Sequence, residues 1–157
     1  MLPLTEKQLD LVERIGVLHD QTGLRPAEGR ILGLLIVASE PELTFDEIRE
    51  ALDLSKSATS NSLHKLQTIG TVVYRTHPGD RKRYFKKSYE NWERAFVERG
   101  VKYLEIRHLL VEALGYRDPA VDETRESMET MIDFLAMLEE SMLDAYDRWQ
   151  KKRNEQE

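Results

Sequence analysis

The chain of 157 residues contains no cysteine. This absence excludes disulfides, thiolate metal sites and cysteine nucleophiles, and it is compatible with a reducing cytoplasm. The longest apolar run, Ile31 to Ala38, is far shorter than the roughly 20 residues that span a bilayer. The start, MLPLTEK, has no basic segment followed by an apolar one, so we expect no signal peptide and a cytoplasmic protein.

Patterns typical of enzymes and metal sites are also missing. The four histidines (His19, His64, His77 and His108) have no His or Cys three or four residues away, so we predict no metal site. Neither a phosphate-binding loop nor a nucleophile motif is present. We therefore expect a protein that is not an enzyme and that needs no cofactor.

About a third of the Lys and Arg residues are concentrated in one window. Residues 54–88 contain eight Lys and Arg against a single acid, Asp80, which gives this window a net charge of +7. The rest of the chain carries −13. Because local charge determines how a protein attracts its partners, the window predicts contact with a polyanion although the whole chain is acidic.

The pattern of residues predicts a mainly α protein with a small β-hairpin. Capping boxes at Thr5 and Thr44 and an N-cap at Ser55 begin three helices. Pro26 suits the first turn of a largely buried helix, in which Gly29 and Gly33 permit close helix packing. Residues 71–76 and 83–87 read as two strands around a turn, and two long helices are expected over 88–116 and 118–152.

Helix, turn, polar helix and hairpin in this order predict a winged helix-turn-helix. Such a fold places the N-terminal half of its second helix in the major groove of DNA, where hydroxyls and amides reach base edges. Asn61 can pair with adenine through two hydrogen bonds, whereas Lys56 and Lys65 are better placed for phosphates. The predicted DNA-binding residues are Ser55, Lys56, Ser57, Ser60, Asn61, His64, Lys65, Arg75, Arg81, Lys82 and Arg83.

Residues 42–88 resemble the DNA-binding unit of MarR-type transcriptional regulators, and the step Asp80-Arg81 matches the acidic-basic step of many MarR wings. The stretch GLRPAEGRILGLL, Gly23 to Leu35, resembles the GbsR-type branch, whose regulators govern genes such as those for glycine betaine synthesis or uptake. The resemblance covers most of residues 5–116. It implies a homodimer, formed through the terminal helices, that presents two recognition helices to a pseudo-palindromic operator. The recognition helix departs from the family pattern, because it has Asn61 and no arginine in its first two turns.

This interpretation divides the chain into three parts. Residues 1–24 form an N-terminal dimerisation or support helix, residues 25–88 the DNA-binding domain, and residues 89–157 the C-terminal dimerisation helices. A heptad seam in the last part is expected to pair with a second chain, with packing inside one chain as the alternative. The seam consists of Met128, Met131, Leu135, Leu138, Met142, Ala145 and Trp149.

Two further interpretations follow. Trp92, Phe96 and Tyr103 fall roughly on one helical face and suggest an aromatic cage for a small-molecule effector such as a quaternary ammonium ion, although aromatics at this spacing are usually core residues. The expected function is that of a sequence-specific regulator that binds double-stranded DNA, most naturally a repressor. The alternative is a winged helix that acts as an interaction scaffold and uses its basic hairpin to bind an acidic protein.

Overall fold

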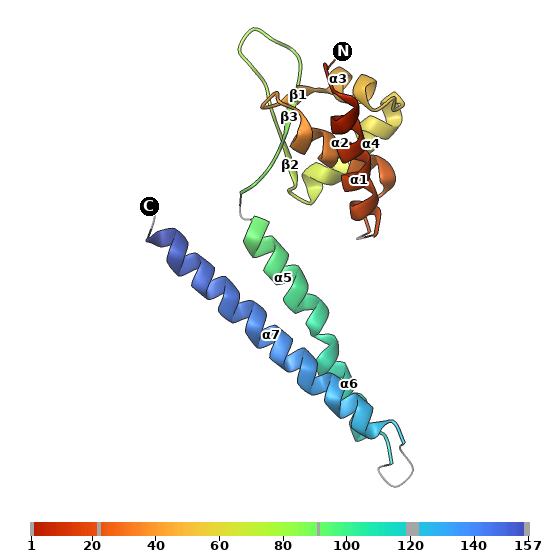
Figure 1. Ribbon diagram of the computed structural model, residues 1–157, viewed down its shortest axis with the longest axis vertical. Coiled ribbons are helices and arrows are strands. Elements are labelled where there is room, and N and C mark those ends of the chain that lie inside the picture. The colour runs from red at the N-terminus through yellow and green to blue at the C-terminus, as the bar shows by residue number, and fades with distance from the viewer. Residues whose placement is uncertain (1, 22, 91, 119–122, 156–157) are drawn as a thin grey trace. The chain divides into compact units, whose positions relative to one another are not determined.

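The computed structural model describes residues 2–21, 23–90, 92–118 and 123–155 (Figure 1). The chain divides into two compact units, Met1–Glu90 and Asn91–Glu157. It is mostly helical with one small antiparallel sheet, as predicted. The elements of unit 1 are α1 (Glu6–Gln21), α2 (Pro26–Val37), β1 (Leu43–Thr44), α3 (Phe45–Ala51), α4 (Lys56–Thr68), β2 (Val72–Arg75) and β3 (Tyr84–Lys87). Those of unit 2 are α5 (Trp92–Leu104), α6 (Ile106–Gly115) and α7 (Arg125–Asn154).

Helices α1 and α2 pack closely because glycines replace side chains at their contact. A Cβ atom at Gly29 would lie 2.8 Å from the carbonyl oxygen of Gly16, and one at Gly33 would lie 2.8 Å from that of Val12. The expected close approach at Gly29 and Gly33 is therefore confirmed. Helix α2 is in turn buried beneath α4, so α1 supports the helix-turn-helix through α2.

The sheet has three strands in the order β1-β3-β2, all antiparallel. The predicted hairpin is present as β2 and β3, with Val72 opposite Lys87 and Arg75 opposite Tyr84. The third strand was not predicted: Leu43 and Thr44 pair with Phe85 and Tyr84. This short third strand joins the hairpin to the segment that leads into α3.

One hydrophobic core holds unit 1 together. Its members come from every element of the unit, and the helix and strand faces that meet there are almost completely shielded from solvent. The core places α3, α4 and the sheet in a fixed arrangement. Its buried residues are Val12, Ile31, Leu32, Leu34, Leu43, Ile48, Leu52, Leu63, Leu66, Val72 and Phe85.

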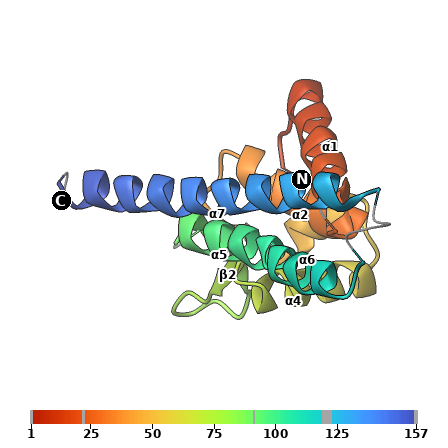
Figure 2. The same cartoon turned by 90° about the horizontal axis from the view of Figure 1, so that it is seen from below.

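Unit 2 is a helical hairpin in which α5 and α6 run along α7 (Figures 1 and 2). Two ion pairs join its two sides: Arg153 to Glu93 at 2.5 Å near the end of α7, and Arg107 to Glu139 at 3.1 Å near its middle. The predicted single helix over 88–116 is wrong, because the chain forms two helices that meet at Glu105. The last helix begins at Arg125 and not at Asp118-Pro119, and Pro119 itself lies outside the described residues.

No described helix is both long enough and apolar enough to cross a membrane. Within the same described ranges, no three His, Cys, Asp or Glu side chains come together as metal ligands would.

Candidate nucleic-acid interface

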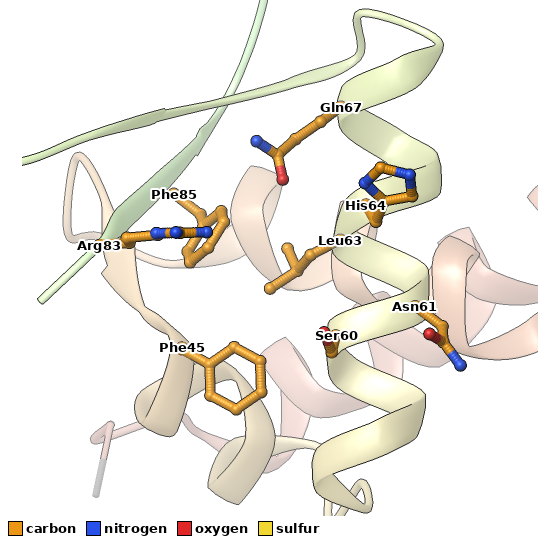
Figure 3. A pocket seen from close by; sticks show the side chains of 8 residues that line it. All are labelled: Phe45, Ser60, Asn61, Leu63, His64, Gln67, Arg83 and Phe85. Atoms are coloured by element: carbon orange, nitrogen blue, oxygen red, sulfur yellow. The ribbon is translucent and has the colours of Figure 1, made fainter.

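Helix α4 has one buried and one exposed face. Thr59, Ser62, Leu63 and Leu66 are buried against the core. The opposite face carries exposed polar side chains, and Asn61 points away from β3 (Figure 3). This division follows the helical period, because residues three and four apart share a face. The exposed predicted DNA-binding residues of this segment are Ser55, Lys56, Ser57, Ser60, Asn61, His64 and Lys65.

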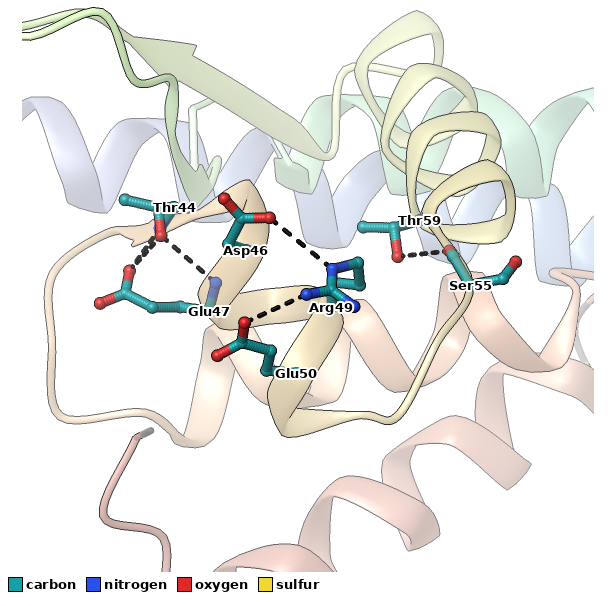
Figure 4. A network of polar contacts seen from close by, with 7 residues as sticks. All are labelled: Thr44, Asp46, Glu47, Arg49, Glu50, Ser55 and Thr59. Atoms are coloured by element: carbon teal, nitrogen blue, oxygen red, sulfur yellow. Dashed lines mark hydrogen bonds and ion pairs between the residues drawn. The ribbon is translucent and has the colours of Figure 1, made fainter.

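Ser55 caps the N-terminus of α4, as predicted. Its hydroxyl oxygen accepts a hydrogen bond from the amide of Ala58 at 3.2 Å and lies 3.1 Å from the hydroxyl of Ser57. The hydroxyl of Thr59 donates to the carbonyl of Ser55 at 3.0 Å (Figure 4). Thr59 is completely buried and is therefore a packing residue.

The N-terminus of α3 has the predicted capping box. The hydroxyl of Thr44 accepts from the Glu47 amide, and the Glu47 carboxylate accepts from the Thr44 amide at 2.7 Å and from its hydroxyl at 2.6 Å (Figure 4). The bond from the Thr44 hydroxyl, and then that from the amide, lowers the pKa of Glu47 below its ordinary value. Because Thr44 also belongs to β1, this cap connects α3 to the sheet.

The loop between β2 and β3, residues 76–83, is called the wing loop below. Asp80 shapes it: its carboxylate accepts from the Lys82 amide at 2.8 Å and from the Tyr84 hydroxyl at 2.6 Å. These bonds, the Tyr84 bond first, lower the pKa of Asp80, and the same contact raises the pKa of Tyr84. Asp80 is thus a turn former, as the turn chemistry of the sequence indicated.

A second contact holds the start of the wing loop. The His77 imidazole meets the carboxylate of Glu42, which precedes β1, and its ring packs edge-on against Tyr84 with 4.6 Å between ring centroids. The wing loop is therefore tied at both Asp80 and His77. Arg81, Lys82 and Arg83 are exposed on this loop, and Arg75 is exposed on β2.

Arg83 is not a free residue of the wing tip. Its guanidinium carbon lies 5.2 Å from the centre of the Tyr74 ring, and the side chain helps to line a hollow between α4 and β3 (Figure 3). This hollow between α4 and β3 is lined by Phe45, Ser60, Asn61, Leu63, His64, Gln67, Arg83 and Phe85. A second hollow is lined by Phe45, Lys56, Ser57 and Ser60.

The structure thus brings part of the predicted site together, Ser60, Asn61 and His64 with Arg83, and adds residues that the sequence did not single out. Gln67 lies seven residues after Ser60 and so on the same side of α4, a signal that the helical period contains. Phe45 and Tyr74 had no such signal, because their importance depends on how α3 and β2 pack beside α4.

The structure divides the heptad seam of α7. Leu135 is buried within unit 2, and a Cβ atom at Gly100 of α5 would clash with the side chain of Met142. Met131, Leu138 and Trp149 remain exposed by 49, 36 and 47%. The expectation that the whole seam faces a second chain is corrected for Leu135 and Met142, because α5 and α6 already cover that side of α7. Met128 is half-buried and Ala145 is exposed.

An exposed apolar stripe remains beside the covered face of α7. Phe134 is 55% exposed and joins it, although the predicted seam did not include this residue. Its members are spaced three, four, seven and four residues apart and so follow the surface of the helix as a narrow band. We call the exposed set Met131, Phe134, Leu138, Ala145 and Trp149 the outer stripe.

The three aromatic residues of α5 do not form a cage within the described part of the chain. Trp92, Phe96 and Tyr103 are exposed by 55, 64 and 79%, and no described ring contact joins them. Tyr103 alone lines a shallow hollow, with Ile106 and Leu109 of α6. An effector site at these residues stays a prediction.

The family model described as MarR family matches residues 22–83. Residues 22–83 are therefore similar to this family. The matched region runs from the residues before α2 through the wing loop and includes all of α4. No curated protein matches the chain.

Three solved structures are similar to this chain. A crystal structure of a transcriptional regulator is 24% identical over 92% of this chain and 99% of its own, with a TM-score of 0.65. A mutant of Staphylococcus aureus MepR bound to an oligodeoxyribonucleotide is 18% identical over 84% of this chain and 90% of its own, with a TM-score of 0.43. The adhesin competence repressor of Streptococcus pyogenes is 21% identical over 85% of this chain and 92% of its own, with a TM-score of 0.40. The first of these has the same fold as this chain over nearly the whole of its length.

Proposed function

We propose that this protein is a sequence-specific regulator of transcription that binds double-stranded DNA as a homodimer. The observation that supports the proposal is the exposed polar face of α4, which lies in a MarR-type region and in a window of net charge +7. The α4 N-terminus would enter the major groove, where Asn61 and His64 reach base edges. The lysines of α4 and the basic residues of the wing loop would bind phosphates.

Two-fold symmetry sets the expected form of the operator. The two α4 helices of a dimer would read half-sites about one helical turn apart, roughly 34–36 Å. Selection of bound duplexes from a random pool would then return a pseudo-palindrome with this spacing. If a dimer neutralises about six to eight phosphates, the slope of log K against log salt is roughly −5 to −7. Binding that does not change with salt would contradict the electrostatic part of the proposal.

Two substitutions separate base reading from phosphate binding. Asn61→Ala should relax the base preference at one position of each half-site and leave nonspecific binding intact, because it removes a base contact only. The double charge reversal Arg81→Glu with Arg83→Glu should weaken binding to all sequences. Equal affinity of both variants and the parent for selected DNA would favour the alternative, a scaffold whose basic hairpin binds an acidic protein.

The outer stripe is the proposed contact between the two protomers in unit 2. Exposed apolar bands of this kind on a long helix are typical of pairing surfaces. Leu138→Glu should therefore shift the protein towards monomer in sedimentation velocity, because it places a charge in the stripe. Met137→Glu is the matched control, since Met137 is 56% exposed but lies outside the stripe. Equal oligomeric states of the two variants would exclude the stripe as the contact.

The finer parts of the proposal are repression, membership of the GbsR-type branch and control by a small molecule. The resemblance of Gly23 to Leu35 to that branch supports a quaternary ammonium effector, and Trp92, Phe96 and Tyr103 are its expected contacts. A ligand that binds the native state raises the melting temperature. Choline or betaine should therefore stabilise the parent and not a Trp92→Ala variant, whereas no shift in the parent would remove this part of the proposal.

A further inference from the structure

The hollow between α4 and β3 differs in chemistry from the rest of the candidate interface. Its floor is apolar, formed by Phe45 and Leu63 with the buried Phe85, and its rim carries the Gln67 amide and the Arg83 guanidinium. Phe45, Leu63, Gln67 and Arg83 all point into the same space in Figure 3. Because apolar side chains and a cationic group face the same space, the hollow fits a ligand that is partly apolar and partly anionic.

Strand geometry explains how Arg83 comes to face α4. Side chains alternate between the two faces of a strand, so Arg83 and Phe85 lie on one face. Tyr74 is directly opposite Phe85 in the register, and the two ring centroids are 6.2 Å apart. The guanidinium of Arg83 packs on the Tyr74 ring at 5.2 Å. A stacked arginine keeps its charge and loses little freedom on binding, so Tyr74 holds Arg83 ready for an anion.

The charge of Arg83 is not neutralised by any residue that the structure describes. The only acid of the window, Asp80, accepts from Lys82 and Tyr84, and no ion pair of the described residues involves Arg83. A guanidinium is well suited to phosphate, because its planar fork of donors matches two phosphate oxygens. The Gln67 side chain across the hollow can donate to the same kind of group, as glutamines often do at nucleic-acid backbones.

The position of the hollow also selects its ligand. In the proposed complex, α4 occupies the major groove and the wing loop lies at the adjacent minor groove. One strand of the duplex separates these two grooves, so it must pass between α4 and β3. That strand offers an anionic phosphate and the apolar carbons of deoxyribose, which correspond to the rim and the floor of the hollow.

We propose that the hollow is a seat for one sugar–phosphate strand of duplex DNA, an inference that depends on the proposed function. Arg83 and Gln67 bind a phosphate, Phe45 packs against the neighbouring deoxyribose, and Tyr74 positions Arg83. Arg83 therefore acts at the backbone between the grooves, and the minor groove is left to Arg81 and Lys82 of the wing loop.

The test measures the salt dependence of binding to a duplex selected from a random pool by the parent protein. Arg83→Gln should reduce the magnitude of the log–log slope by about 2 for a dimer, because each protomer loses one phosphate contact worth about 0.9. Affinity at moderate salt should fall by about tenfold or more. Arg94→Gln is the matched control, since it removes one exposed arginine of α5, 67% exposed in its pair with Glu98, and should leave the slope unchanged.

Tyr74 is tested through its dependence on Arg83. Tyr74→Leu should weaken DNA binding when it is made in the parent, but should cause no further loss of affinity when it is made in Arg83→Gln. Tyr74→Phe retains the ring face, so its slope of log K against log salt should be close to that of the parent. Additive effects of Tyr74→Leu and Arg83→Gln would overturn the positioning role. Circular dichroism melts of each variant show whether its fold is intact.

A second measurement changes the DNA and compares the parent protein with Arg83→Gln. Single phosphates of the duplex are replaced by neutral methylphosphonates, one at a time. At one position in each half-site, this replacement should weaken DNA binding by the parent and leave DNA binding by Arg83→Gln unchanged. The seat is excluded if no phosphate position behaves in this way. It is also excluded if Arg83→Gln and Arg94→Gln have the same slope of log K against log salt. If the parent selects no duplex at all, the proposed function fails and the seat fails with it.

Discussion

The contact between α1 and α2 gives a sharp prediction for Gly33→Ala. Alanine is usually preferred to glycine inside a helix, by about 1 kcal/mol. At Gly33, however, the new Cβ would lie 2.8 Å from the carbonyl oxygen of Val12, 3.2 Å from its Cα and 3.3 Å from the Cβ of Ile15. The two nearest atoms belong to the backbone and cannot rotate away, so α1 must move as a whole.

The expected size of the effect follows from these opposing terms. Overpacking a closely packed contact typically destabilises by about 1–3 kcal/mol, and the upper part of this range applies where backbone must shift. After the helix preference is subtracted, Gly33→Ala should lower the free energy of unfolding by about 1–2 kcal/mol. For a chain of this length the melting temperature should fall by roughly 2–8 °C.

The assay is thermal and urea unfolding followed by circular dichroism. Gly115→Ala is the control, because Gly115 also lies in a helix but a Cβ there would meet no atom within 4 Å. This control should be neutral or slightly stabilising. A Gly33→Ala variant at least as stable as the parent would refute the close contact of α1 with α2.

Two further predictions concern capping and the wing loop. Thr44→Ala should destabilise by about 1 kcal/mol and raise the pKa of Glu47 towards its ordinary value, while Thr44→Ser should behave like the parent in urea unfolding and in carboxyl NMR titration. Because the pKa of Asp80 is lowered in the folded state, its contribution to stability is complete above the ordinary value of 3.8 and is lost as pH falls through the lowered one. Tyr84→Phe removes the larger cause, so the NMR titration of Asp80 should move up towards 3.8, and an unchanged titration would contradict the assigned bond.

Features with local causes could be predicted from the sequence. The caps at Thr44 and Ser55 depend on residues three positions away, and both are present in the structure. The buried and exposed faces of α4 depend only on the helical period. The turn chemistry around Asp80 likewise indicated the loop between the two strands of the hairpin.

Features that depend on distant parts of the chain were missed. Strand β1 has two residues and exists because Phe85 and Tyr84 pair with it, more than 35 positions along the chain. The predicted helix over 88–116 is interrupted at Glu105, and no proline or glycine lies at this break to indicate it in the sequence. On α7, a seam of apolar residues indicates contact but does not tell which members meet α5 and α6.

The candidate site shows the same limit. Exposed polar residues of α4 could be selected from the helical pattern, and their role in DNA binding stays a prediction. Arg83 was grouped with the wing tip because it follows Arg81 and Lys82 directly. Its stacking on Tyr74 depends on strand register, which a one-residue shift would have reversed.

The ties of the wing loop have a consequence for the kinetics of recognition. The bonds of Asp80 and the contact of His77 with Glu42 give the loop a defined shape in the free protein. A preorganised loop loses little conformational entropy when it meets its target, so more of the contact energy is available as affinity. Association would then require no folding step, and its rate would be determined by electrostatic attraction between the basic loop and the duplex.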